Sequence, residues 1–184
     1  MAAGYSLDIV KASLNNPEIV NIQRGMVQIN IGNTEAVEVL AAFDPTKSVL
    51  VNMGHYSTSL VPGERLATLE IVDGVTVKGK QGLAAAASAT QIFYILIEFG
   101  RRVKQVYFHE ASLLAGASNE QWNPSAAALS KKIFFSAGSR NNSALAAFTD
   151  ILGRIRWATD VWLFSERDTT VGDTVMNMFV AEMD

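Results

Sequence analysis

The side chains that most often carry chemistry are few in this chain, and their spacing does not suit a reaction. The chain has two histidines, His55 and His109, and no cysteine. Neither histidine has another His, Asp or Glu at the close spacing of zinc or non-haem iron sites. A Ser or Cys nucleophile has no support, because a Gly-x-Ser-x-Gly turn is also missing. Residues 77–82 lack the spacing of a phosphate-binding loop. We therefore predict no metal, no cofactor and no enzyme activity.

Acidic residues offer two weaker candidates for a site. Glu98 and Glu182 occupy equivalent positions in two similar halves of the chain. A glycosidase pair must flank one bond at about 5 to 9.5 Å, whereas equivalent positions in separate domains normally lie farther apart. We therefore interpret both as residues near strand ends. A calcium loop built from Glu166, Asp168 and Asp173 is disfavoured, because their spacing fits no known pattern.

The three tryptophans, Trp122, Trp157 and Trp162, all lie in the second half of the chain. Two interpretations stay open. In the first, the indole rings fill a core or pack across strands. In the second, they form an exposed platform that stacks on a sugar ring, which gives an alternative function as a carbohydrate-binding module for host-surface glycans.

The elements that must position these residues follow from an internal repeat. Lys47 and Lys131 lie 84 positions apart, and the apolar runs that follow them coincide. A repeat of this length indicates a domain duplication rather than a solenoid unit. We predict an N-terminal arm at 1–18 and two β-sandwich domains at 19–100 and 103–184. The aligned segments are 47–54 with 131–138, 90–99 with 174–183, 69–71 with 155–157 and 75–77 with 161–163.

Within each copy, the hydrophobic pattern predicts short strands. Val27, Ile29 and Ile31 alternate with polar or flexible residues, which is typical of a half-buried strand. The pair Asp73-Gly74 between two β-branched runs predicts a hairpin with a tight type I′ turn. Several short strands with turn signals, and no long amphipathic helix, indicate an all-β fold of tandem duplicated antiparallel β-sandwich domains with a short N-terminal arm or helix.

The strand expected at 92–99 is apolar on both faces, although a sandwich strand normally exposes one face to water. Something must cover its outer face, either the sister domain or another subunit. We favour another subunit, because an exposed apolar strip promotes association. Ile92, Tyr94 and Leu96 are the predicted contact residues.

The N-terminal arm is a second candidate for a subunit contact. Ser6 can cap a short helix in which Leu7, Val10 and Leu14 share one face. A helix this short is marginal alone, so it must pack on something. It either packs on its own domain or grips another subunit.

Charge and hydropathy exclude two classes of partner. The net charge is −3, with 15 basic and 18 acidic residues, so no field of a single sign attracts nucleic acid. The longest apolar run is far shorter than the roughly 20 residues of a membrane helix. No basic stretch leads into an apolar one at the N-terminus, so we expect synthesis in the cytosol.

Three segments of the first copy carry a resemblance to a known family. They are Ile22-Gln23-Arg24-Gly25, the run from Asp44 to Val51, and the strand from Ile92 to Phe99 that ends in Glu-Phe. With these segments the first copy resembles small all-β virion proteins of tailed bacteriophages over most of residues 19–100. In the second copy only the strand pattern continues, since Tyr107-Phe108-His109 replaces Gln23-Arg24-Gly25.

The resemblance implies a virion location and a role without catalysis, in a tail, collar, fibre or capsid decoration. It carries over no binding residue. The implied partners are other virion proteins and further copies of the chain, in a homo-oligomer such as a trimer.

Overall fold

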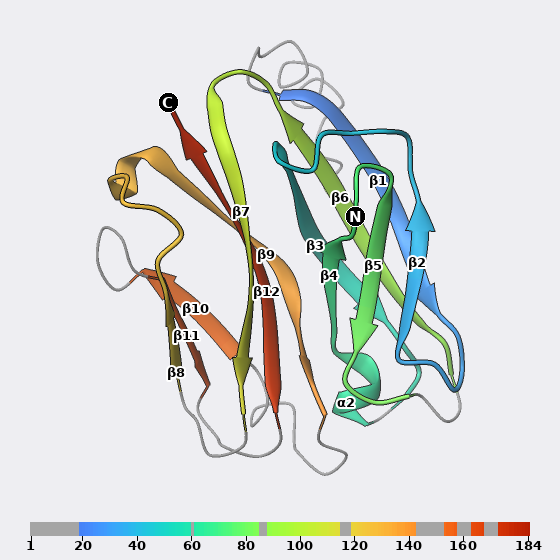
Figure 1. Ribbon diagram of the computed structural model, residues 1–184. Coiled ribbons are helices and arrows are strands. Elements are labelled where there is room, and N and C mark those ends of the chain that lie inside the picture. The colour runs from blue at the N-terminus through green and yellow to red at the C-terminus, as the bar shows by residue number, and fades with distance from the viewer. Residues whose placement is uncertain are drawn as a thin grey trace, which may run out of the picture.

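The computed structural model describes residues 19–59, 61–84, 88–114, 119–142, 153–157, 163–167 and 173–184. The predicted N-terminal arm, with Leu7, Val10 and Leu14, lies outside the described residues, as does Trp162. The described part of the chain is almost entirely β-structure, and all its strand pairs are antiparallel (Figure 1). The predicted all-β, sandwich-like fold is therefore confirmed.

The elements of the two halves follow one plan. The first half contains β1 (Ile19–Ile29), β2 (Glu35–Val39), β3 (Ser48–Tyr56), α2 (Pro62–Arg65), β4 (Ala67–Ile71), β5 (Thr76–Gln81) and β6 (Thr90–Phe99). The second half contains β7 (Val103–Leu113), β8 (Asn119–Trp122), η1 (Leu129–Lys131), β9 (Lys132–Asn141), β10 (Gly153–Trp157), β11 (Leu163–Arg167) and β12 (Thr174–Met183).

Strand order shows the duplication directly. The first half contributes the sheet β1-β6-β3 and the strands β2-β5-β4, and the second half contributes β7-β12-β9 and β8-β11-β10. The register also repeats. Ser48 pairs with Glu98 in the first half, and their counterparts Lys132 and Glu182 pair in the second. The two halves are therefore copies of one strand plan, as the repeat predicts.

Both copies also share a bulge at a glycine. Gly54 in β3 and Gly138 in β9 have φ angles of 130° and 105°, which residues with a side chain rarely adopt. The register shifts at both positions. The side chain two residues before accepts a hydrogen bond from each glycine N–H, at 2.8 Å from Asn52 Oδ1 and at 3.4 Å from Ser136 Oγ. Sequence thus fixes the same bend in both halves.

The predicted hairpin is present between β4 and β5, but its turn differs. Val72 N donates to Thr76 O at 3.0 Å, so the connection is longer than a two-residue turn. Gly74 is not among the described glycines with positive φ, so the predicted type I′ turn is wrong. Asp73 Oδ1 instead accepts a hydrogen bond from Val75 N at 2.9 Å. Such an Asx turn satisfies the backbone without positive φ angles.

The two halves are joined into one body. Strand β4 pairs with β9 through Thr68 and Gly138, which creates a six-stranded sheet in the order β2-β5-β4-β9-β12-β7. The main hydrophobic cluster draws residues from both halves, including Leu50 and Leu96 from the first and Phe179 from the second. The predicted domain boundary falls at the β6–β7 turn, yet the core continues across it. Independent folding of 19–100 and 103–184 stays a prediction.

The predicted partner contacts on β6 are wrong. Ile92, Tyr94 and Leu96 are at most 2% exposed and belong to the main core. Tyr94 donates its hydroxyl to Glu38 Oε2 of β2 at 2.8 Å, so this face looks toward the second sheet of its own half. The error has a simple origin, because a strand with two apolar faces does not reveal from sequence which face looks inward. The outer face carries Phe93, which is 44% exposed.

Strand β12 is apolar on both faces for a different reason. Met176, Met178 and Val180 pack in a second cluster inside their own half. Phe179 and Ala181 instead belong to the main cluster together with residues of the first half. For this strand the sister half is the cover, which is the alternative to a subunit contact.

Candidate functional site

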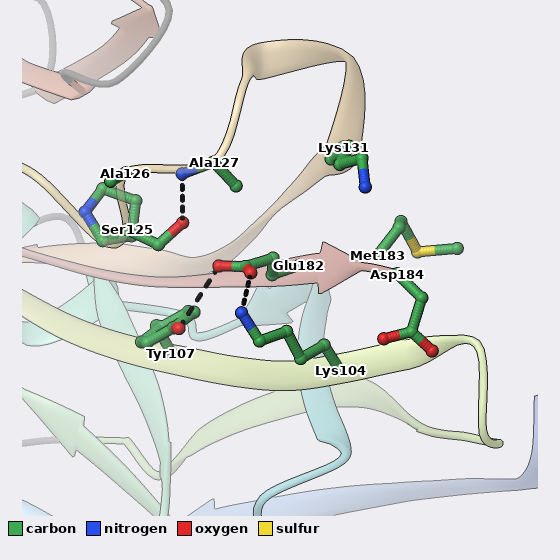
Figure 2. Close-up of a pocket in the computed structure, with 10 residues that line it drawn as sticks. Lys104, Tyr107, Ser125, Ala126, Ala127, Lys131, Glu182, Met183 and Asp184 are labelled. Atoms are coloured by element: carbon green, nitrogen blue, oxygen red, sulfur yellow. Dashed lines mark hydrogen bonds and ion pairs between the residues drawn. The ribbon is translucent and has the colours of Figure 1, made fainter.

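A hollow of about 730 Å³ lies where β7 begins and β12 ends (Figure 2). Three segments line it: the start of β7, the connection between β8 and β9, and the last residues of the chain. The lining residues that bear polar or large side chains are Lys104, Tyr107, Ser125, Lys131, Glu182, Met183 and Asp184.

Glu182 is the buried charge of this site. Lys104 Nζ lies 2.8 Å from Glu182 Oε1, and the Tyr107 hydroxyl lies 3.3 Å from Glu182 Oε2 (Figure 2). Hydrogen bonds from Lys104 and then from Ser125 hold the pKa of the Glu182 carboxyl below its usual value. Burial and the neighbouring carboxylate raise the pKa of Tyr107.

This geometry makes Glu182 a structural anchor. A general acid needs a carboxyl whose pKa is raised toward the working pH, whereas the pKa of Glu182 is shifted down. Its oxygens already accept hydrogen bonds from β7 and from the 125–131 connection. The buried Lys132 also binds this connection, because its Nζ donates to Ser125 O at 2.7 Å. The carboxylate thus fixes a loop to two strands.

Lys131 contributes an available ammonium group to the hollow. Its side chain is exposed and extends from the η1 turn toward the end of β12 (Figure 2). Within the described part of the chain, its Nζ has no hydrogen-bond or ion-pair partner. An ammonium group in this position can receive carbonyl or carboxylate oxygens from a ligand or a partner.

The corresponding place in the first half is filled. Lys47, the counterpart of Lys131, donates Nζ to the carbonyl oxygens of Val103 and Lys104, the latter at 2.8 Å. Glu98, the counterpart of Glu182, accepts a hydrogen bond from Asp44 N at 3.0 Å. In the first half, the surface around Lys47 therefore binds the second half. In the second half, the equivalent surface around Lys131 is the open hollow.

The predicted acidic candidates are not brought together into one site. Glu98 and Glu182 lie near the ends of β6 and β12, as expected, and each is bound by its own neighbours. Residues 77–82 lie largely in β5, so they form a strand rather than a phosphate loop. Asp168 lies outside the described residues. No group of three or more His, Asp or Glu able to hold a metal ion is found among the described residues.

The histidines and tryptophans have mixed outcomes. Trp122 is half-buried against the second cluster and stacks on His109, with ring centroids 4.6 Å apart and planes 10° apart. His109 Nε2 lies 2.7 Å from Glu120 Oε1. Trp122 thus packs across strands, which is the first of its two interpretations. Trp157 is the last residue of β10.

His55 is a half-buried residue of a strand. It lies in β3 beside the Gly54 bulge, where a second hollow of about 380 Å³ lies between β3 and β9. Its Nδ1 has no partner in the described structure. Burial, with a smaller contribution from Arg65, lowers the pKa of its ring.

Sequence reasoning missed the hollow, although one signal was available. The repeat aligns Lys131 with Lys47 and Glu182 with Glu98. The alignment does not show the contact between the halves. In that contact Lys47 binds carbonyl oxygens of the other half, whereas Lys131 has no such acceptor within the described residues.

No helix in the described chain is long and apolar enough to cross a membrane. Comparison with protein families, characterised proteins and solved structures gives no match to this chain.

Proposed function

We propose that this protein is a non-enzymatic structural component of a tailed-bacteriophage virion, in the tail, collar, fibre or capsid decoration. It acts as a homo-oligomer and binds other virion proteins. The family resemblance of residues 22–25, 44–51 and 92–99 supports the virion assignment. The all-β fold agrees with that family's expected architecture.

One observation supports an assembly role above others. The first half receives the second half through Lys47 and an apolar surface, whereas the equivalent surface of the second half is open around Lys131. The buried carboxylate near that surface has a lowered pKa and holds a loop in place. The polar groups thus support a docking surface rather than a reaction centre.

The test is a mass measurement combined with a particle assay. Light scattering or mass photometry of the purified chain should show an oligomer at micromolar concentration, and the labelled chain should co-sediment with phage particles assembled in its presence. A chain that stays monomeric and does not associate with particles contradicts the proposal.

The alternative is a carbohydrate-binding module for host-surface glycans, and Trp122 is its best-placed residue. Its indole is only half-buried and lies on β8, at the edge of the β10-β11-β8 sheet. The Glu120 carboxylate nearby is of the kind that binds sugar hydroxyls, but it already contacts His109 and accepts Ser112 N at 2.8 Å. A glycan array compares the wild type with Trp122→Ala. Loss of a specific glycan signal in a variant that remains folded supports this alternative, and unchanged binding removes Trp122 from it.

A further inference from the structure

The contact between the two halves has two distinct sides. The second half contributes the docking face, five apolar side chains that are at most 8% exposed and belong to the main cluster. The first half contributes the receiving surface, made of its 43–47 loop, the end of β6 and the edge of β4. The docking face consists of Val103, Val106, Ala137, Phe179 and Ala181. The receiving residues are Phe43, Thr46, Lys47, Thr68 and Phe99, of which Thr46 and Thr68 contribute their backbone.

Polar bonds fix how the two sides meet. Val106 N donates to Thr46 O at 2.9 Å, and Lys47 Nζ donates to the carbonyl oxygens at the start of β7. Asn177 Nδ2 donates to Leu69 O of β4 at 3.0 Å. The two sides share almost no equivalent positions. The contact is therefore heterologous, which means that two different surfaces meet. Because the halves are copies, each half carries a version of both the docking face and the receiving surface.

The first half keeps its own copy of the docking face, and this copy is only partly covered within the described residues. The counterparts of the five buried residues are all apolar in the first half. Four of them are half-buried, and two of these, Ile19 and Ile97, pack against the main cluster. Met53, the counterpart of the fully buried Ala137, is 59% exposed. Sequence thus preserves apolar side chains at positions that the described residues cover only in part. The five counterparts are Ile19, Ile22, Met53, Ile95 and Ile97.

The second half keeps its own copy of the receiving surface, and this copy is the hollow. Ala127, Lys131 and Met183 line the hollow and are the counterparts of Phe43, Lys47 and Phe99. The counterpart of Thr68 is position 154 in β10. That strand pairs only with β11 in the described structure, so the backbone edge that accepts β9 in the first half is present and unpaired here.

We propose that copies of this chain assemble head to tail, with the first-half docking face of one copy on the second-half receiving surface of the next. The occupant of the hollow is thus the start of β1 from another copy. Lys131 Nζ binds the carbonyl oxygens of Ile19 and Val20, and Ile22 N donates to Ser130 O, by repetition of the bonds within the chain. A heterologous contact of this kind closes into a ring or extends into a filament.

This inference rests on the proposed homo-oligomeric function and specifies its interface. The test uses Met53→Glu, which places a charge on the docking face, and Lys131→Glu, which reverses the charge on the receiving surface. Val37→Glu is the matched control, since Val37 is 58% exposed against 59% for Met53 and lies on β2, away from both surfaces. All three sites are exposed, so the folded chain tolerates the changes, and circular dichroism melting checks this.

Mass photometry should show the wild type and Val37→Glu in the same oligomer distribution. Met53→Glu should weaken self-association by more than about 100-fold, because an unpaired buried charge costs several kcal/mol. Lys131→Glu should also be monomeric. An equimolar mixture of these two variants should form a one-to-one dimer, since one copy retains the receiving surface and the other the docking face.

Three results overturn the head-to-tail arrangement. The first is a Met53→Glu variant with the wild-type mass distribution. The second is a Lys131→Glu variant that still assembles, and the third is a mixture that stays monomeric. Either of these indicates a face-to-face contact. A wild-type chain that is itself monomeric contradicts the proposed function instead, so the two failures are distinguishable.

Discussion

The bulge glycines of the two halves form a natural pair of test sites. Gly54 and Gly138 occupy equivalent positions and have φ angles of 130° and 105°. Their surroundings differ. A Cβ atom added at Gly54 meets nothing within 4 Å, whereas one added at Gly138 lies 2.6 Å from Asn52 Nδ2 and still nearer to the Ala67 carbonyl oxygen. Substitution by alanine therefore imposes the same backbone conformation at both sites but a steric clash at only one.

The expected magnitudes follow from these two effects. Holding alanine at a positive φ angle costs about 1–3 kcal/mol at either site. At Gly138 the β4 backbone must also move, because Ala67 is fully buried and its carbonyl cannot rotate away. Overpacking of this kind adds about 1–3 kcal/mol. Gly138→Ala should thus lower the free energy of unfolding by about 2–6 kcal/mol, and Gly54→Ala by about 1–3 kcal/mol.

Urea denaturation followed by tryptophan fluorescence measures both values, at a protein concentration low enough to keep each variant monomeric. The informative quantity is the difference between the two variants, because the shared backbone strain cancels in it. Equal losses of stability would refute the close approach of β9 to β4 and, with it, the joining of the two halves at Gly138.

Three further changes test the remaining groups. Because the pKa of His55 is lowered in the folded chain, the unfolded chain binds the proton more readily as pH falls through 6.5. The free energy of unfolding should therefore decrease below that pH. His55→Gln should lose this decrease, which urea titrations above and below pH 6.5 measure. The lowered pKa of Glu182 acts in the acid range. Its contribution should be complete above 4.5 and vanish as pH falls through the folded-state pKa, and Glu182→Gln should lose that pH dependence in thermal melts. Tyr94→Phe removes a hydroxyl that donates to Glu38, so it should lower the free energy of unfolding by about 1 kcal/mol in urea, and an unchanged midpoint would contradict that bond.

The residues predicted from sequence and those that were missed differ in one physical respect. Strand positions and the duplication were predictable, because Lys47 and Lys131 start apolar runs of the same period and register. Local capping was harder to predict. The Asp73 carboxylate accepts a backbone bond and removes the need for the positive φ angles that Asp-Gly suggests.

Contacts between sheets and between halves were not predictable. Ile92 and Phe93 are neighbours of similar hydrophobicity, yet one is fully buried and the other is 44% exposed. Only the position of the second sheet decides between them. The role of Lys131 depends likewise on a contact made by Lys47, a residue in the other copy.

Side-chain volume gives an independent reason to regard the two open surfaces as complementary. On the receiving side, Phe43 is replaced by the much smaller Ala127, so the second half has a hollow where the first half is filled. On the docking side, Val103 and Val106 are replaced by the larger Ile19 and Ile22. Volume lost at Phe43 of the receiving surface is thus gained at these two docking positions, while Ile95 is smaller than its counterpart Phe179.

The lysine of the receiving surface and the central residue of the docking face also fit a contact between two copies. The lysine of the receiving surface is kept in both copies, as Lys47 and Lys131, and its acceptors are backbone carbonyls that any sequence provides. At the centre of the docking face, Ala137 becomes the longer Met53. Random divergence would favour a polar residue at an exposed position such as that of Met53, since an exposed apolar side chain gains nothing in a monomer. Retained apolar character with compensating volume is what a buried contact between two copies requires.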